Sequence, residues 1–429
     1  MDPAGGRKNA FGYFRRSGRR WGTAFVRGIF TIVAFLSWVT GGFYRREDPG
    51  VFQGRETQAG APKNAQDVKK ILLIRMDLLG DVILTMPAVA ALRKGYPLAH
   101  ITMLVLPYTA PALDLFPYVD RVVTFDINKL RPSGDMLNLS HYRDLWRLLH
   151  RLRQERYDLA VSFYGLYAGI LALISGARLR IGYRGEGCPF LFNLPVPGRR
   201  YEVPQHEVEY DLALARAAGA CETLVALTPA IPEEVKDRAL ALLSHEGVGP
   251  QDLLVAIHPG STNGTAKRWT IQGWAALADR VATELGAGVI FNGVASEMPL
   301  VREITGRMKT TPVVMAGKTS IPELAYLLTR CRVLVTGDSA PLHLAWSLGV
   351  PVVGLYGPTD PVVSGPYGGR SVVLRKEISC SPCYDLLDTA ECRRESVACM
   401  EAITEEEVFT AVKRALQEFA PASQGTRAE

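Results

Sequence analysis

The chain has 429 residues, of which 48% are hydrophobic and 21% are charged. This length favours two domains over one, and the composition fits neither a disordered chain nor a multi-span membrane protein. The net charge of +6 is uneven: residues 1–50 carry nine Lys/Arg and three Asp/Glu, whereas the remainder carries 40 of each. A neutral body argues against nucleic-acid binding, which needs a basic face.

Residues 1–66 form a predicted segment of their own, with an apolar run at 21–44 and a polar linker at 47–66. Only 17 residues separate Arg27 from Arg45, which is at the short limit for a membrane span. Three interpretations remain open for the apolar run: a cleaved signal peptide, a single span, or an apolar helix lying in the interface of an anionic membrane.

Residues 67–228 are predicted to form a first α/β domain. We expect strands at 71–74, 100–107, 121–127 and 157–164, and helices at 82–94 and 142–156. Strands that alternate with helices predict a parallel sheet covered on both faces.

The pattern then restarts, and residues 229–420 are predicted to form a second α/β domain. We expect strands at 253–261, 288–293, 333–339 and 351–358, and helices at 232–246, 272–285, 322–330 and 341–348. Ligands of open α/β sheets bind beyond the carboxyl ends of the strands. Polar or Gly-containing clusters lie at such ends, at 78–81, 258–269, 336–343 and 356–361.

Four features together resemble the heptosyltransferase family of glycosyltransferases, glycosyltransferase family 9. They are IRMDLLGDVILTMPAVAALR, HPGS followed by KRW, VTGDSAPLHLAWSLGVPVVGLYGPTDP and a late cysteine cluster, within about 69–415. The resemblance implies a GT-B fold, in which two Rossmann-like domains face a central cleft. It also implies an inverting transfer of a sugar, heptose from ADP-heptose, onto a lipopolysaccharide core or a related lipid-linked glycan. It also implies that the reaction needs no metal ion. The nucleotide sugar is a co-substrate, so the resemblance implies no cofactor.

The resemblance also bears on the membrane segment. A span at 21–44 would leave the body outside the cytoplasm under the positive-inside rule, away from a cytosolic nucleotide sugar. We therefore favour a helix lying on the cytoplasmic face of the inner membrane, with a single N-terminal span as the alternative.

Asp81 follows Gly80 at the predicted turn between a strand and a helix. An aspartate here is a good helix N-cap, but the resemblance matches Asp81 to the family's proposed general base, which takes the proton of the acceptor hydroxyl. Gly80 and Asp81 are therefore the predicted acceptor-side residues. Asp77 is a second candidate for the general base. Its position in the sequence favours the alternative, a solvated loop residue without a catalytic role.

The resemblance places the donor in the second domain. Lys267 matches a family lysine that contacts donor phosphate and neutralises the leaving group, although a surface pair with Arg268 is the alternative. Backbone amides near Ser339 suit a pyrophosphate because they lie at a predicted helix start. Asp338 matches a family acid that contacts the donor, and His343 is alternatively a core histidine. The predicted donor-binding residues are Gly260, Ser261, Thr262, Lys267, Asp338, Ser339, Ala340, Pro341, His343, Gly357 and Thr359.

Two questions stay open at the level of sequence. Cys380, Cys383, Cys392 and Cys399 fit reduced thiols, a metal site or disulfides, because the first pair has zinc-like spacing and the second does not. The alternative functions are a nucleotide-sugar epimerase, which needs no acceptor, a glycosyltransferase with another donor, and a non-catalytic membrane scaffold.

Overall fold

Two six-stranded sheets form the framework of the protein, and both belong to one compact unit, Ala59–Glu429. The computed structural model describes residues 67–127, 139–186, 189–198, 200–201, 204–220, 226–262, 264–383, 391–392, 394 and 396–419. Strand neighbours in both sheets run parallel.

The first sheet has the strand order β3-β2-β1-β4-β5-β6. Its strands are β1 (Lys70–Arg75), β2 (His100–Val105), β3 (Arg121–Thr124), β4 (Leu159–Ser162), β5 (Leu179–Tyr183) and β6 (Leu194–Val196). The accompanying helices are α2 (Leu79–Gly95), α3 (Leu139–Gln154), α4 (Gly165–Ile174) and α5 (Glu207–Ala217), with short 3-10 turns η4 (Ala110–Leu115) and η6 (Pro189–Leu191).

The second sheet has the order β12-β11-β10-β7-β8-β9, the same topology in later strands. Its strands are β7 (Leu254–His258), β8 (Gly288–Phe291), β9 (Val313–Val314), β10 (Val333–Gly337), β11 (Val352–Tyr356) and β12 (Ser371–Arg375). Its helices are α6 (Glu233–His245), α7 (Ile271–Leu285), η7 (Ala295–Glu297), α8 (Met298–Thr305), α9 (Ile321–Arg330), α10 (Ala340–Ser347), α11 (Pro361–Ser364), α12 (Ala398–Glu401) and α13 (Glu405–Glu418).

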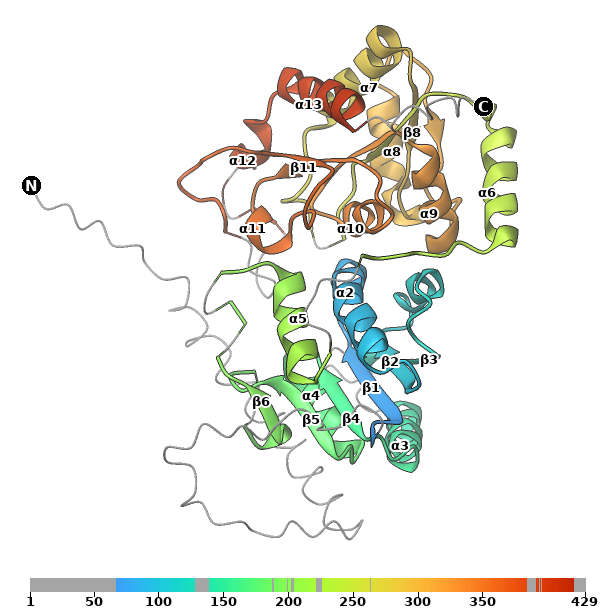
Figure 1. Ribbon diagram of the computed structural model, residues 1–429. Helices are drawn as coiled ribbons and strands as arrows, with labels where there is room; N and C mark the ends of the chain where they lie inside the picture. Colours follow the sequence, from blue (N-terminus) through green and yellow to red (C-terminus); the bar gives the residue numbers. More distant parts are fainter. Residues whose placement is uncertain are drawn as a thin grey trace, which may run out of the picture. The chain divides into compact units, whose positions relative to one another are not determined.

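Both sheets have the 3-2-1-4-5-6 order of the Rossmann fold, which confirms the predicted α/β class with two parallel sheets. The central strands form for a simple reason: β1 (KILLIR) and β10 (VLVTG) are continuous short runs that are buried almost throughout, as in sheets covered on both faces. Figure 1 shows α2 and α5 running beside each other on the first sheet, where they are in contact.

The predicted strands are all present. The strand predicted at 71–74 is one residue longer at each end, whereas the other predicted strands end earlier than predicted because their last residues belong to the loops that follow. The sequence pattern did not identify β5, β6, β9 and β12. β6 has only three residues, β9 has two, and the residues of β12 are partly or fully exposed. Each is too short or too polar to give a buried-strand signal.

The predicted segment 1–66, including the apolar helix at 21–44, lies outside the described residues. Among the helices that are described, none combines the length and the apolar character needed to cross a bilayer. The predicted domain boundaries, at 66 and at 228, stay predictions.

Candidate active site

Asp81 lies in the first turn of α2, directly after the carboxyl end of β1. The helix begins at Leu79, earlier than predicted, so Asp81 is its third residue and not its N-cap. Its Oδ2 nevertheless accepts a hydrogen bond from the backbone N–H of Leu78, at 3.3 Å. One carboxylate oxygen thus supports the helix start from the third helical residue, as in a capping box, and this contact replaces the N-cap role that the sequence had offered as an alternative.

The electrostatic surroundings of Asp81 suit proton transfer. Its side chain is 31% exposed, and its Oδ1 lies 3.6 Å from Nη2 of Arg75. Shielding from water raises the pKa of Asp81 to about 7, Arg75 opposes this rise, and Asp77 adds to it. A carboxyl group whose pKa lies near the working pH is an efficient general base.

Asp77 is not the solvated loop residue that its sequence position suggested. Its side chain is 21% exposed, and its Oδ2 lies 3.0 Å from Nε of Arg75. Burial raises the pKa of Asp77 to about 6, against the attraction of Arg75. Tyr108, which follows β2, donates a hydrogen bond from its hydroxyl to the Asp77 carbonyl at 3.4 Å. The ends of β1 and β2 therefore meet at this point, as parallel topology requires.

Three predicted donor-side residues form one connected group in the second sheet. Nζ of Lys267 lies 2.8 Å from Oδ2 of Asp338, and the two side chains are 13% and 9% exposed. Lys267 is therefore no surface lysine. Nε2 of His343 lies 3.8 Å from Oδ1 of Asp338, and burial lowers the pKa of His343 to about 4. The imidazole is neutral near pH 7, and its buried Nδ1 has no hydrogen-bond partner in the described part of the chain.

The loop after β7 is built around Gly260. A Cβ at this position would lie only 1.9 Å from Oε1 of Glu297, so glycine permits the close approach of that buried carboxyl group. Ser261 is buried and donates its hydroxyl proton to the carbonyl of Gly264. Its Oγ also accepts a hydrogen bond from Nε of Arg268 at 3.3 Å. The Ser261 hydroxyl proton is thus already donated to a carbonyl within the loop. The neighbouring predicted residue, Thr262, is exposed to solvent.

Ser339, Ala340 and Pro341 form the start of α10, at the carboxyl end of β10. The Ser339 side chain does not cap the helix; its Oγ lies 2.8 Å from Oγ1 of Thr336. The N–H groups of a first helical turn have no partner inside the helix and attract anions. This geometry fits the predicted pyrophosphate contact.

Gly357 and Thr359 follow β11 and are both buried. The Thr359 hydroxyl has no hydrogen-bond partner in the part of the chain that is described. Buried polar groups are usually hydrogen-bonded, so an unpartnered hydroxyl at this place suits the donor contact predicted for Thr359.

Residues predicted on the acceptor side and on the donor side approach each other where α2 contacts α10, and Figure 1 shows α10 over the end of α2 that Asp81 occupies. A Cβ at Gly80 would lie 2.7 Å from Cδ2 of His343. Glycine therefore lets the two helices approach closely. Asp81 follows Gly80 in the chain, and Oδ1 of Asp338 lies 3.8 Å from Nε2 of His343. Gly80 itself is buried, so any acceptor contact by Gly80 involves its backbone.

Two of the late cysteines, Cys383 and Cys399, lie beside the loop that follows β11. Cys380, Cys392 and Cys399 are free thiols. A Cβ at Gly357 would lie 2.9 Å from Sγ of Cys399, and the Ser381 hydroxyl donates to the Gly357 carbonyl. Within the described residues, no group of three or more His, Cys, Asp or Glu is arranged to hold a metal ion.

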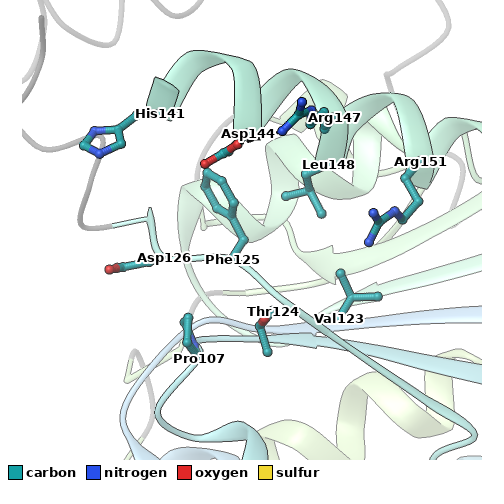
Figure 2. A pocket seen from close by; sticks show the side chains of 10 residues that line it. All are labelled: Pro107, Val123, Thr124, Phe125, Asp126, His141, Asp144, Arg147, Leu148 and Arg151. Carbon is teal, nitrogen blue, oxygen red and sulfur yellow. Dashed lines mark hydrogen bonds and ion pairs between the residues drawn. The ribbon is translucent and has the colours of Figure 1, made fainter. Parts of the chain in front are cut away.

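A separate cavity of about 330 Å³ lies between β3 and α3, and Figure 2 shows the side chains that line it. Neither Asp81 nor Lys267 belongs to it. The lining residues are Pro107, Val123, Thr124, Phe125, Asp126, His141, Asp144, Arg147, Leu148 and Arg151. The last two residues of β3 and the two residues that follow the strand line it, so it lies at the carboxyl end of β3.

Sequence reasoning missed the charged residues that support Asp81. Arg75, Arg200, Glu207 and Asp211 are all buried, and Glu297 is buried beside the Gly260 loop. The only local signal was Arg75 itself, a charged residue at the end of an apolar strand. Arg75 and Asp211 are 136 residues apart in the chain, so no local pattern could pair them.

Comparison with known proteins gives a consistent result. A family model described as glycosyltransferase family 9 (heptosyltransferase) matches residues 145–393. The chain is 27% identical over 320 residues to lipopolysaccharide heptosyltransferase 2 of Salmonella typhimurium, covering 71% of this chain and 88% of that protein.

Solved structures agree with this match. A glycosyl transferase family 9 protein from Veillonella parvula superimposes with a TM-score of 0.67 at 25% identity, covering 81% of this chain and 97% of that one. The E. coli ADP-heptose lipopolysaccharide heptosyltransferase II gives a TM-score of 0.63 at 25% identity, covering 81% and 98%.

Proposed function

The chain belongs to glycosyltransferase family 9, the heptosyltransferase family, and is a glycosyltransferase; from this premise we propose that it transfers heptose from ADP-heptose to a lipid-linked glycan such as a lipopolysaccharide core. One observation carries the proposal: Asp81 adjoins the contact of Gly80 with His343, and His343 belongs to the group that contains Asp338 and Lys267. The candidate base therefore lies next to the contact of α2 with α10, and the candidate phosphate-binding cation is linked to that contact through Asp338 and His343. The donor and acceptor classes are those in the names of the relatives.

The proposed chemistry is a single displacement. The acceptor hydroxyl oxygen attacks the anomeric carbon while ionised Asp81 takes its proton. The bond from that carbon to the diphosphate oxygen breaks, and its electron pair leaves with the nucleoside diphosphate. Attack opposite the leaving group inverts the anomeric configuration.

Lys267 and the start of α10 stabilise the leaving diphosphate in this proposal. The ammonium group of Lys267 is mostly shielded from water, where its attraction for a developing negative charge is stronger than in bulk solvent. Asp338 holds Lys267 in place by accepting a hydrogen bond from its ammonium group at 2.8 Å. A donor phosphate then competes for the same ammonium group and releases an Asp338 oxygen toward a sugar hydroxyl.

A donor panel tests the proposal. Purified protein is incubated with ADP-, UDP- and GDP-linked sugars, each with and without a lipid-extract acceptor. We expect turnover with ADP-heptose and only in the presence of acceptor. Release of an isomerised nucleotide sugar without acceptor supports the epimerase instead, and preference for another nucleotide changes the donor assignment.

Transfer is expected to continue unchanged in EDTA. The sequence has no Asp-x-Asp pair between 69 and 415, and the proposed neutralisation of the diphosphate rests on Lys267 and on helix N–H groups. The initial rate is measured after dialysis against EDTA and again after adding magnesium or manganese. A rate that is lost with the chelator and restored by a metal contradicts this assignment.

Deleting residues 1–62 is expected to abolish binding to anionic vesicles while transfer to a deacylated, soluble acceptor continues. The excess positive charge and an apolar run both lie in this segment, and a basic apolar helix binds anionic membranes. Vesicle sedimentation at low and high salt measures this, with zwitterionic vesicles as the control. Equal sedimentation of the truncated and complete chains contradicts the anchor.

A further inference from the structure

Arg75 lies behind the candidate base, surrounded by four carboxyl groups. Its guanidinium side chain is 2% exposed, with Nε 3.0 Å from Asp77 Oδ2 and Nη2 3.6 Å from Asp81 Oδ1. On its other side, Nη2 lies 3.7 Å from Glu207 Oε2 and Nη1 lies 3.4 Å from Asp211 Oδ1. Arg75 therefore joins the two active-site carboxylates to two carboxylates of α5.

A second buried guanidinium group fixes those α5 carboxylates. Arg200 forms ion pairs with Glu207 and Asp211, and its Nε lies 3.5 Å from Oε1 of Glu186. Its Nη2 donates a hydrogen bond to the Phe163 carbonyl at 2.6 Å. The guanidinium fork can hold several oxygens in fixed directions, so Arg200 orients the carboxylates that face Arg75.

The backbone is also connected to this ionic group. Thr85 Oγ1 lies 2.8 Å from the Asp81 carbonyl and 2.7 Å from Oδ2 of Asp211, which ties α2 to α5. Tyr201 has a positive φ of 63°, a conformation that is uncommon and costly for non-glycine residues. Its hydroxyl contacts Glu207. The cluster is thus held from several segments of the chain.

We propose that Arg75 is a positioning residue for the transfer reaction, holding Asp81 and Asp77 at the end of β1, and that α5 fixes Arg75 through Glu207 and Asp211. The inference rests on the proposed function, because it takes Asp81 as the base. Five carboxyl groups and two guanidinium groups share this region. Of these two guanidinium groups, Arg75 is the one that contacts Asp81. In this proposal it therefore fixes the position of the Asp81 carboxylate and favours its ionised form.

The test is the pH profile of kcat/KM for the acceptor in the full-length enzyme. The groups that face Asp81 from the neighbouring elements are Arg75, Asp77, Tyr108, Glu207, Asp211 and His343. In the wild type the rate should fall below about pH 7, where Asp81 becomes protonated.

Arg75→Gln removes an attraction that lowers the pKa of Asp81. The acid limb is therefore expected to move up by about one pH unit or more, and displacement of the base should reduce kcat about 10²-fold. Calorimetric affinity for the donor stays unchanged. Arg75→Lys restores the charge but not the fork, so it should return the acid limb toward the wild type without restoring kcat.

Glu207→Gln gives a shift of the opposite sign, because the Glu207 charge raises the pKa of Asp81. Its acid limb should move to lower pH, whereas the control Glu209→Gln, on the same helix, should not shift. If Arg75→Gln folds and its limb is unmoved, or if it does not fold and Glu207→Gln leaves the limb unmoved, the proposal is wrong. Asp81→Ala in the same series separates the two hypotheses: retained turnover removes the base assignment itself.

Discussion

Asp81→Ala is expected to reduce turnover by roughly 10²–10⁴-fold, the contribution typical of a general base, while donor affinity stays the same. The carboxyl group is placed at the first turn of α2 and has a pKa raised to about 7, whereas the predicted donor contacts belong to the second sheet. Steady-state rates and calorimetric donor titration measure the two effects separately. Asp114→Ala, which removes an exposed carboxylate of the same half, is the matched control.

The melting temperature of the Asp81→Ala variant shows whether Asp81 acts as a catalytic base or only stabilises the start of α2. Because the pKa of Asp81 is raised by burial in the folded state, the native protein binds more protons than the unfolded chain between about pH 4 and 7. Stability therefore falls as the pH rises through this window, and removing the carboxyl group should not lower the melting temperature above pH 7. A large loss of stability with near-normal turnover means that Asp81 only supports the helix start. Asp77 is then the next candidate for the base.

Lys267→Ala is expected to weaken donor binding and also to slow transfer, by about 10²–10³-fold in kcat. The ammonium group binds phosphate in the ground state, and its contribution increases as the leaving group gains charge. The variant also leaves Asp338 without the partner that lies 2.8 Å away. A mostly buried carboxylate without this cation repels the donor phosphate, which increases the loss of affinity.

A second variant shows whether the loss in Lys267→Ala comes from the lysine or from the unpaired carboxylate. Lys267→Ala combined with Asp338→Asn removes that repulsion, so donor affinity should recover in part while kcat remains low. Lys318→Ala is the control, since Lys318 pairs with Glu246 in a more exposed ion pair. Unchanged kcat and unchanged donor affinity in Lys267→Ala contradict the role of Lys267.

The framework of the fold could be predicted from the sequence because it is encoded locally. Buried strands contain continuous apolar runs, such as ILLI at 71–74 and VLV at 333–335, and their alternation with helices specifies parallel sheets. Strands without such runs were missed: β5 contains Arg180 and Gly182, and β6 contains Pro195. Their pairing depends on neighbours in the sheet and not on their own composition.

The candidate site also contains residues that the sequence predicted and residues that it did not. Asp81, Lys267, Asp338 and His343 follow predicted strands, where ligands of α/β sheets bind, and the resemblance supplied their roles. The ionic support of Asp81 was not predictable, because Arg75 contacts residues far along the chain. The start of α2 at Leu79 was missed as well. Leu78 and Leu79 are apolar and give no helix-start signal of their own. The turn at this point is stabilised by the Asp81 carboxylate, which accepts a hydrogen bond from the Leu78 N–H.

Analysis of the transfer product tests the central claim most directly. The full-length enzyme is incubated with ADP-heptose and a deacylated lipopolysaccharide-core acceptor, and the product is examined by mass spectrometry and by NMR of the new glycosidic bond. We predict a gain of one heptosyl unit, with anomeric configuration opposite to that of the donor, and no product from Asp81→Ala on the same timescale. An unmodified acceptor with a changed nucleotide sugar, or a product that retains the donor configuration, contradicts the account.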